Sequence, residues 1–250
     1  MRRLFDIVCV LICGIAPVGA ARATNTGQGA SWDEVKQLPD WGGVWNWVNK
    51  PVPTFPMTAK GQEQLDMIAR IRGAQGDIPA RSKNCVLGGF PADPVGPEEY
   101  TTEFTFTPGQ ITVTGSQGYA RRLYTDGRKH RGGRKSLQGD SIAHWEGDTL
   151  VVDTVSLNDG NELYYGFRGG ADMHIVERIH LTDANTLAMD YEITAQEMFT
   201  QPIHYTTFLA RHRDWTTLEM NCAQNQRSVD ENGNQTLELT RKPYSSDKEP

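Results

Sequence analysis

The stretch SIAHWEGDTLVVDT, residues 141–154, has the pattern of two short strands joined by a tight turn. β-branched and aromatic residues alternate with polar ones on both sides of Glu146-Gly147-Asp148, and this period-two alternation is typical of strands with one buried face. Gly147 supplies the positive φ that a tight hairpin turn requires. The stretch therefore predicts a β-hairpin with strands over 141–145 and 149–155.

The length of the turn decides which face of this hairpin His144 occupies. A three-residue turn places His144 on the face of Leu150 and Val152. A two-residue turn places it on the face of Val151 and Asp153 instead. Both turn lengths are compatible with the sequence.

The same alternation recurs along the rest of the chain. Further strands are expected over 103–107, 111–115, 118–125, 173–181, 186–194, 204–212 and 217–222. At least eight short strands thus follow one another at about ten-residue spacing, which is typical of an antiparallel barrel or sandwich. The sequence predicts a mainly β fold, either an antiparallel, lipocalin-like β-barrel or a sandwich.

The segment before these strands predicts one or two short N-terminal helices. Residues 31–34 (SWDE) form a capping box that opens a helix to about residue 37. A second helix is expected over 59–71, where apolar residues form one stripe. Between the two helices, WGGVWNW (41–47) suits a first strand. After the second helix, residues 73–99 are expected to form a long ordered loop.

The first 23 residues have the features of a secretory signal peptide. Two arginines precede an apolar run over 7–20, and the small-x-small sequence Ala-Arg-Ala ends at residue 23. The run is too short to span a bilayer comfortably. We therefore expect a periplasmic or secreted protein with a single β-rich domain over 24–240 and a flexible tail over 241–250.

The net charge argues against two classes of partner. The 250 residues carry a formal charge of −6, and removal of residues 1–23, which contribute a net positive charge, leaves about −8. An acidic chain of this kind is not expected to bind nucleic acid or to attach to a membrane by its charge. No membrane anchor is expected, and the oligomeric state is left open.

Two cysteines, Cys85 and Cys222, remain after removal of the signal peptide. In an exported protein such a pair is expected to form a disulfide, with two buried free thiols as the alternative. Neither cysteine has a CxxC partner, so a metal site at this pair is not expected.

Two consecutive motifs resemble the signature of a known family. RRLYTDGRKH (121–130) is followed by GDSIAHWEGDTLVVDT (139–154), and together they resemble the TDGRxH…WEGDTLVVDT signature of a family of uncharacterised secreted bacterial β-rich proteins. Related features occur in CVLGGFP (85–91), VERIHL (176–181) and TQPIHY (200–205).

This resemblance covers most of residues 85–222. It implies export and a β-rich fold, and it implies no particular reaction. The chain departs from the family pattern at Ala143, where the family often has Gly, and after His130, where it often has Pro. These departures imply a loop of different shape.

A carboxylate lies on the apolar face of the strand predicted over 173–181. Four apolar residues of this strand share one face, and Glu177 falls on the same face. A carboxylate in an apolar wall is costly unless it is paired or protonated, and its pKa rises if it is unpaired. Glu177 is therefore the main candidate for a catalytic acid or base, with a buried structural ion pair as the alternative.

The strand predicted over 118–125 provides a partner for this carboxylate. In one phase of the strand Arg121 and Tyr119 face inward. In the other phase Arg122 and Tyr124 face inward. Arg121 would hold the inward carboxylate or an anionic substrate by a bidentate contact, which makes it a second candidate catalytic residue.

The stretch DGRKHRGGRK, residues 126–135, carries five basic side chains in an acidic protein. At the mouth of a barrel such a loop would steer a carboxylate or phenolate ligand inward, whereas the alternative is a solvated loop. The candidate ligand-binding residues are Tyr119, Tyr124, Arg128, His130, Trp145 and Asp153. His144 joins Glu177 and Arg121 as a candidate catalytic residue.

The sequence lacks the common metal and nucleophile motifs. His174 and His180 share the outward face of their strand but are too far apart for one metal site within it. There is no HExxH motif and no GxSxG motif. We therefore expect no metal, no cofactor and no covalent serine catalysis.

Three functions are compatible with these features. The first is an exported, cofactor-independent acid–base enzyme, a lyase, isomerase or hydrolase, acting on a small aromatic or apolar molecule, or an anionic one, in a barrel cavity. The second is a non-catalytic periplasmic barrel that binds a small ligand. The third is a structural or envelope-interaction protein with a filled barrel. The enzyme is favoured because a plain binding barrel has little reason to bury Glu and Arg together.

Overall fold

The computed structural model describes residues 29–49, 53–75, 89–91, 101–115, 119–164, 166–217, 227–229 and 235–237. The predicted signal peptide, both cysteines of the predicted disulfide, most of the strand predicted over 217–222 and the C-terminal tail lie outside these residues. Those expectations therefore stay predictions.

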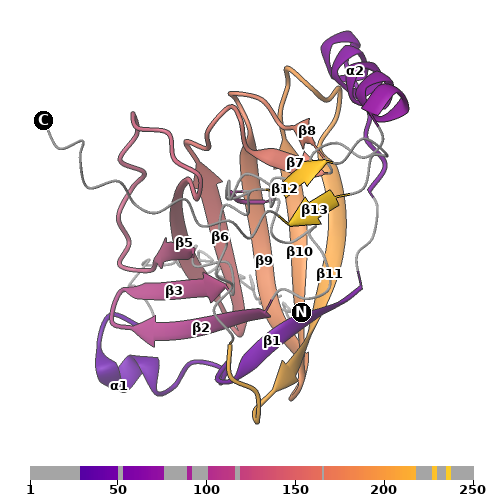
Figure 1. Ribbon diagram of the computed structural model, residues 1–250. Coiled ribbons are helices and arrows are strands. Elements are labelled where there is room, and N and C mark those ends of the chain that lie inside the picture. The colour runs from indigo at the N-terminus through magenta and orange to yellow at the C-terminus, as the bar shows by residue number, and fades with distance from the viewer. Residues whose placement is uncertain are drawn as a thin grey trace, which may run out of the picture.

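Nine strands form a closed barrel (Figure 1). In their order around the barrel they are β1 (Val44–Asn49), β11 (Ile203–His212), β10 (Thr186–Thr194), β9 (His174–Asp183), β6 (Thr149–Val155), β5 (Asp140–Glu146), β4 (Ala120–Tyr124), β3 (Gln110–Gly115) and β2 (Thr101–Thr107). Closure leaves no unpaired edge strand. The fold is mainly β and the architecture is a barrel rather than a sandwich.

The hairpin of β5 and β6 has a two-residue turn. Trp145 lies opposite Leu150 and Glu146 opposite Thr149, so that only Gly147 and Asp148 form the turn. Gly147 has a φ of 61° and occupies the first central position, the arrangement of a type II′ turn. This register places the side chains of β5 and β6 alternately inside and outside the barrel.

One pair of strands departs from the antiparallel prediction. β4 and β5 run parallel, and only Leu123 with Ser141 and Tyr124 with Ile142 are partners. Parallel neighbours require a crossover connection instead of a hairpin. Residues 125–139, here called the crossover loop, provide that connection. Since the overlap is short, this seam is the most weakly paired position in the barrel wall.

The two predicted helices are present, with different lengths. α1 (Trp32–Val35) is a single turn capped as expected, with Ser31 Oγ accepting a hydrogen bond from the Glu34 amide at 3.3 Å. α2 (Ala59–Gln75) is four residues longer than predicted and projects from one end of the barrel (Figure 1). Neither of these helices has both the length and the apolar character needed to cross a bilayer.

Two small sheets add to the barrel. β7 (Glu162–Tyr164) pairs with β8 (Phe167–Arg168), and β12 (Arg227–Val229) pairs with β13 (Gln235–Leu237). The sequence did not predict these strands, because two or three residues are too few to display an alternating pattern.

Aromatic side chains fill one end of the barrel core. The Trp41 ring lies 5.2 Å from Phe104, 5.5 Å from Phe106 and 5.4 Å from Trp145, measured between ring centroids. Trp45 is fully buried beside them. Trp145 is thus part of the core, and its expected role as a ligand-binding residue is not supported by its position. The inner wall toward the opposite ends of β5 and β6 is polar.

Candidate functional site

An ion pair lies on the inner wall of the barrel. Arg121 of β4 and Glu177 of β9 both point inward, and Arg121 Nη1 donates to Glu177 Oε1 at 3.0 Å. Arg121 Nη2 donates to the other carboxylate oxygen, so the contact is bidentate. Their side chains are 5% and 0% exposed. The structure therefore selects the strand phase in which Arg121 faces inward, and Arg122 faces outward.

Other donors of Arg121 bind side chains of the barrel wall. Nη2 donates to Thr154 Oγ1 at 2.8 Å, and both Nε and Nη2 lie 3.3 Å from Ser141 Oγ. The Phe90 ring covers the guanidinium, with 3.6 Å from Cζ to the ring centroid. Arg121 thus ties β4 to β5, β6 and β9 across the parallel seam.

The barrel interior beside this pair is narrow. A cavity of about 30 Å³ lies among Phe90, Tyr119, Arg121 and Tyr191. A single water molecule needs about 10–15 Å³ measured in this way, whereas sites for drug-sized ligands have several hundred. Tyr119, one of the predicted ligand-binding residues, lines the cavity, but the cavity between the described residues admits only one or a few waters.

Two stacked tyrosines continue the polar inner wall. Tyr191 of β10 lies opposite Glu177 in the strand register, and its ring stacks on Tyr205 of β11 with 4.7 Å between centroids. Burial raises the pKa of the Tyr191 hydroxyl well above its usual value, and the Glu177 charge adds to the increase. Burial, with Glu177, also raises the pKa of Tyr205. Both tyrosines are therefore neutral phenols at physiological pH.

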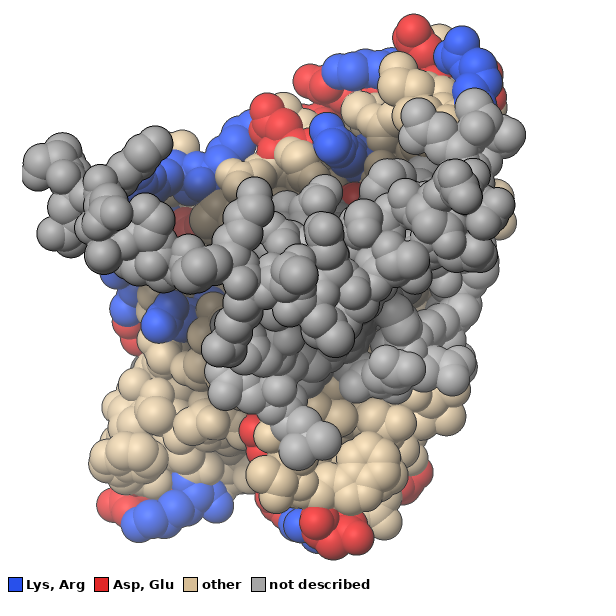
Figure 2. Space-filling view, in the orientation of Figure 1, with Lys and Arg blue, Asp and Glu red and all other residues tan. Residues whose placement is uncertain are grey.

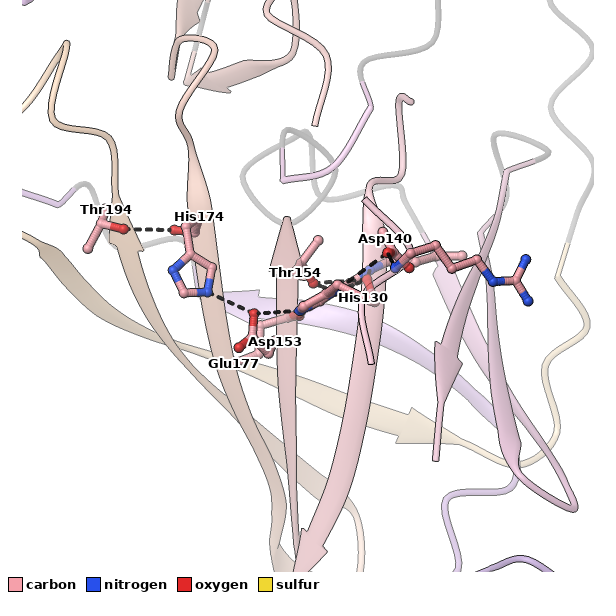
Figure 3. A network of polar contacts seen from close by, with 10 residues as sticks. His130, Asp140, Asp153, Thr154, His174, Glu177 and Thr194 are labelled. Carbon is pink, nitrogen blue, oxygen red and sulfur yellow. Dashed lines mark hydrogen bonds and ion pairs between the residues drawn. The ribbon is translucent and has the colours of Figure 1, made fainter. Parts of the chain in front are cut away.

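A second polar network lies on the outer wall, on the opposite side of β6. Asp153, next to Thr154 in the sequence, points outward and its Oδ1 atom lies 2.7 Å from His174 Nε2 and 3.2 Å from His130 Nε2 (Figure 3). We call these three residues the outer cluster. The side chains of Asp153, His174 and His130 are 43%, 41% and 23% exposed, so the cluster is open to solvent.

The crossover loop brings His130 to this position. His130 Nδ1 lies 3.5 Å from Asp140 Oδ2 at the start of β5, and the same oxygen accepts a hydrogen bond from the Arg131 amide at 2.7 Å. The two imidazoles approach Asp153 from opposite sides (Figure 3). In the part of the chain that the structure describes, no group of three or more His, Cys, Asp or Glu residues has a geometry that could hold a metal ion.

Basic residues of the crossover loop lie near this network. Lys129, Arg131 and Arg134 are exposed and form no ion pair with another described residue. Arg128 pairs with Asp126 and covers the outer face of Tyr124, with 3.7 Å from Cζ to the ring centroid. Lysine and arginine side chains gather at the upper left of Figure 2, on the side where Figure 1 shows this loop.

The structure does not bring all predicted site residues together. His144 lies on the outer face, because the hairpin turn has two residues, and its Nε2 atom is 3.2 Å from Glu146 Oε1. It therefore cannot act with Glu177 inside the barrel. Tyr124 and Arg128 also lie outside, whereas His130 and Asp153 meet in the outer cluster.

Sequence reasoning missed His174 as a site residue. The alternation of its strand predicted that His174 points outward. For Asp153, one of the two possible hairpin registers predicted the same orientation. The missing information was that β6 and β9 are neighbours in the barrel, since β7 and β8 lie between them in the chain.

The chain matches no family model and no curated protein.

Proposed function

We propose that this protein is an exported acid–base enzyme of the lyase, isomerase or hydrolase type, and that its reaction takes place at the outer cluster. One observation carries the proposal: a single carboxylate oxygen of Asp153 binds two imidazoles, and all three side chains remain accessible. A histidine held by a carboxylate is the usual arrangement of a general base. The reaction needs only proton transfer from these side chains.

His174 is the proposed base and Asp153 its orienting group. When His174 Nε2 carries the proton and donates it to Asp153, the lone pair of Nδ1 is available to a substrate. The side chain is 41% exposed, so a small molecule can approach the ring. His130 Nε2 lies on the other side of the same carboxylate oxygen, so it helps to hold Asp153 in place beside the proposed base.

The proposed substrate is a small carboxylate or phenolate. The chain is acidic overall, with a formal charge of −6, yet the crossover loop presents Lys129, Arg131 and Arg134 without carboxylate partners among the described residues. Local positive charge raises the local concentration of anions. Such a loop favours an anionic substrate over a neutral one.

The inner wall offers less support for catalysis. Both oxygens of Glu177 accept hydrogen bonds from Arg121, and the carboxylate is fully buried beside a cavity of about 30 Å³. A general base needs a free lone pair and room for its substrate. We therefore assign Arg121 and Glu177 to the stability of the barrel.

A non-catalytic barrel that binds a small ligand is the second candidate. One observation favours it: Gln138 Oε1, Tyr205 Oη and Thr207 Oγ1 are buried and have no hydrogen-bond partner among the described residues. A buried polar group without a partner costs about 1–3 kcal/mol. A ligand that entered the barrel and supplied such partners would recover part of that free energy. This candidate, too, is periplasmic or secreted.

The test compares variants on the two walls. Wild type, His174→Gln and Glu177→Gln are incubated with an extract of small organic acids and phenols, and mass spectrometry records the compounds consumed and those retained by the protein. We expect a compound that wild type consumes and that His174→Gln consumes at least about 100-fold more slowly, the loss typical of removing a general base. Glu177→Gln should retain turnover at temperatures where it stays folded.

His180→Gln is the matched control, because His180 lies on the outer face of the same strand and outside the cluster, with Nδ1 3.9 Å from Asp190 Oδ2. It should consume the compound at the wild-type rate. Retention of one compound by all variants, with none consumed, favours the binding protein. If folded Glu177→Gln loses turnover and His174→Gln does not, the proposal is wrong and the reaction takes place at the inner wall.

A further inference from the structure

His130 lies between two carboxylates that belong to different strands. Its Nε2 atom is 3.2 Å from Asp153 Oδ1 on β6, and its Nδ1 atom is 3.5 Å from Asp140 Oδ2 on β5. Nδ1 is buried and has no hydrogen-bond partner among the residues that the structure describes. One ring nitrogen is therefore bonded, while the other faces an acceptor without a bond.

The protonation state of the imidazole decides whether this second contact becomes a hydrogen bond. A neutral imidazole has one N–H group, and when Nε2 donates it to Asp153 the lone pair of Nδ1 faces a second anion. A protonated ring has two N–H groups, and each then meets a carboxylate. Hydrogen bonds between ionised partners are the shorter and stronger kind.

The same carboxylate also holds the backbone of the crossover loop. Asp140 Oδ2 accepts the Arg131 amide at 2.7 Å, so this carboxylate attaches the loop to the barrel wall next to the unbonded Nδ1 of His130. The ends of the loop are held separately, by Arg128 over the ring of Tyr124 in β4 and by Lys135 with Asp159. In the middle of the loop, whose cations have no ion-pair partner among the described residues, the contacts to the barrel wall run to Asp140 and Asp153.

We propose that His130 is a proton-controlled anchor of the crossover loop. Protonation of Nδ1 adds a bond to Asp140 and fastens the loop, with Lys129 and Arg131, beside the outer cluster. Deprotonation removes that bond and loosens the loop. The inference deepens the proposed function and rests on it only in the consequence for substrate binding, because the anchor itself is measurable without a substrate.

The charged groups around His130 come from four elements. Asp140 belongs to β5 and Asp153 to β6, while Arg131 belongs to the loop itself. His174 of β9 shares Asp153 Oδ1 with His130, at 2.7 Å from its Nε2 atom, and is a second ionisable group in the cluster. The contribution of His174 therefore has to be separated from that of His130 by a variant.

The experiment is hydrogen exchange of the Arg131 backbone amide, followed by nuclear magnetic resonance on the whole protein. Exchange is measured at about pH 5 and about pH 8, the range in which histidine changes charge, and is corrected for the intrinsic effect of pH on the chemical rate. We expect protection about tenfold greater at the lower pH in wild type, the factor that corresponds to one additional charge-assisted hydrogen bond. His174→Gln should show the same difference.

Two variants should lose the pH dependence. Asp140→Asn keeps an oxygen that can accept the Arg131 amide but removes the charge that faces His130. His130→Gln keeps an amide donor toward Asp153 but does not titrate. Equal protection at both pH values in wild type, or an undiminished pH effect in Asp140→Asn, would overturn the proposal. If the Arg131 amide shows the pH effect but the protein has no turnover, the anchor stands and the proposed enzyme function is wrong. If the protein has turnover but the amide shows no pH effect, the enzyme function stands and the anchor is wrong.

Discussion

Thr154 and Asp153 are neighbours in the chain, and their side chains belong to two polar networks with opposite properties. Thr154 joins the Arg121–Glu177 pair inside the barrel, where these three side chains are bonded to one another and are shielded from solvent. Asp153 joins two histidines outside, where the three side chains are 23% to 43% exposed. The difference teaches that a buried polar group whose hydrogen bonds are all made contributes to stability. A polar group with an accessible lone pair can take part in a reaction.

The inner network compensates for a weakness of the barrel itself. The parallel seam between β4 and β5 has only two pairs of partner residues, whereas β9 and β10 have nine. Arg121 crosses this seam with hydrogen bonds to Ser141, Thr154 and Glu177. Side-chain bonds therefore supply connections that a longer strand pairing would otherwise make.

The largest expected effect is on this inner pair. Glu177→Gln leaves Arg121 charged, buried and without its counter-ion, which costs about 3–5 kcal/mol in comparable cases. We expect the free energy of unfolding, measured by urea denaturation, to fall by that amount. The double variant Arg121→Met/Glu177→Leu removes both charges and should lose much less than the single variant. An unfolding free energy of Glu177→Gln within about 1 kcal/mol of wild type would contradict the assigned role.

A second effect of the inner wall should be visible at alkaline pH. The pKa values of Tyr191 and Tyr205 are raised in the folded protein, mainly by burial, so both hydroxyls keep their protons when the unfolded chain loses them at about pH 10. Their contribution to stability is complete below that pH and falls as pH rises toward the folded-state values, by up to about 1.4 kcal/mol per pH unit for each tyrosine.

The measurement is urea denaturation between about pH 9 and about pH 11, on either side of the ordinary tyrosine value. Wild type should lose stability steeply above about pH 10. Tyr205→Phe should reduce the loss of unfolding free energy per pH unit by the contribution of one tyrosine, and Tyr191→Phe should reduce it by the same amount. Identical slopes in wild type and in the variant that lacks both hydroxyls would show that burial of these tyrosines does not control the alkaline limit.

The smallest expected effect on stability is on the outer wall. Asp153→Asn changes a side chain that is 43% exposed, and asparagine retains an oxygen that can accept from either histidine. We expect a loss of less than about 1 kcal/mol in the free energy of unfolding, as is usual for exposed charge pairs. Turnover of the compound identified with wild type should nevertheless fall. A stability loss as large as that of Glu177→Gln would remove the contrast between the two walls.

Much of this arrangement was readable from the sequence. Period-two alternation predicted strands near the observed positions, and it placed Glu177 on an inward face, where it is 0% exposed. The capping box at Ser31 and the glycine of the hairpin turn were also where local chemistry indicated. These features depend on a few consecutive residues, and local sequence is sufficient to encode them.

Other features depended on distant parts of the chain. The phase of β4 was ambiguous because both of its faces carry an arginine and a tyrosine, and only packing against β9 selected Arg121. The side of the barrel that His144 occupies followed from a turn of two residues, a length that Gly147 alone did not specify. The interior expected to hold a ligand is largely filled by aromatic and apolar side chains.

The sequence by itself determined the strands, the hairpin, the inward carboxylate and the basic stretch that became the crossover loop, because each is a property of local alternation, turn chemistry or charge. Only the tertiary structure decided that the barrel closes through a parallel seam, that Arg121 reaches Glu177, and that His130, Asp153 and His174 meet on the outer wall. The physical reason is that strand order and register join residues tens of positions apart, and these are fixed by the packing of the whole barrel and not by any single stretch of chain.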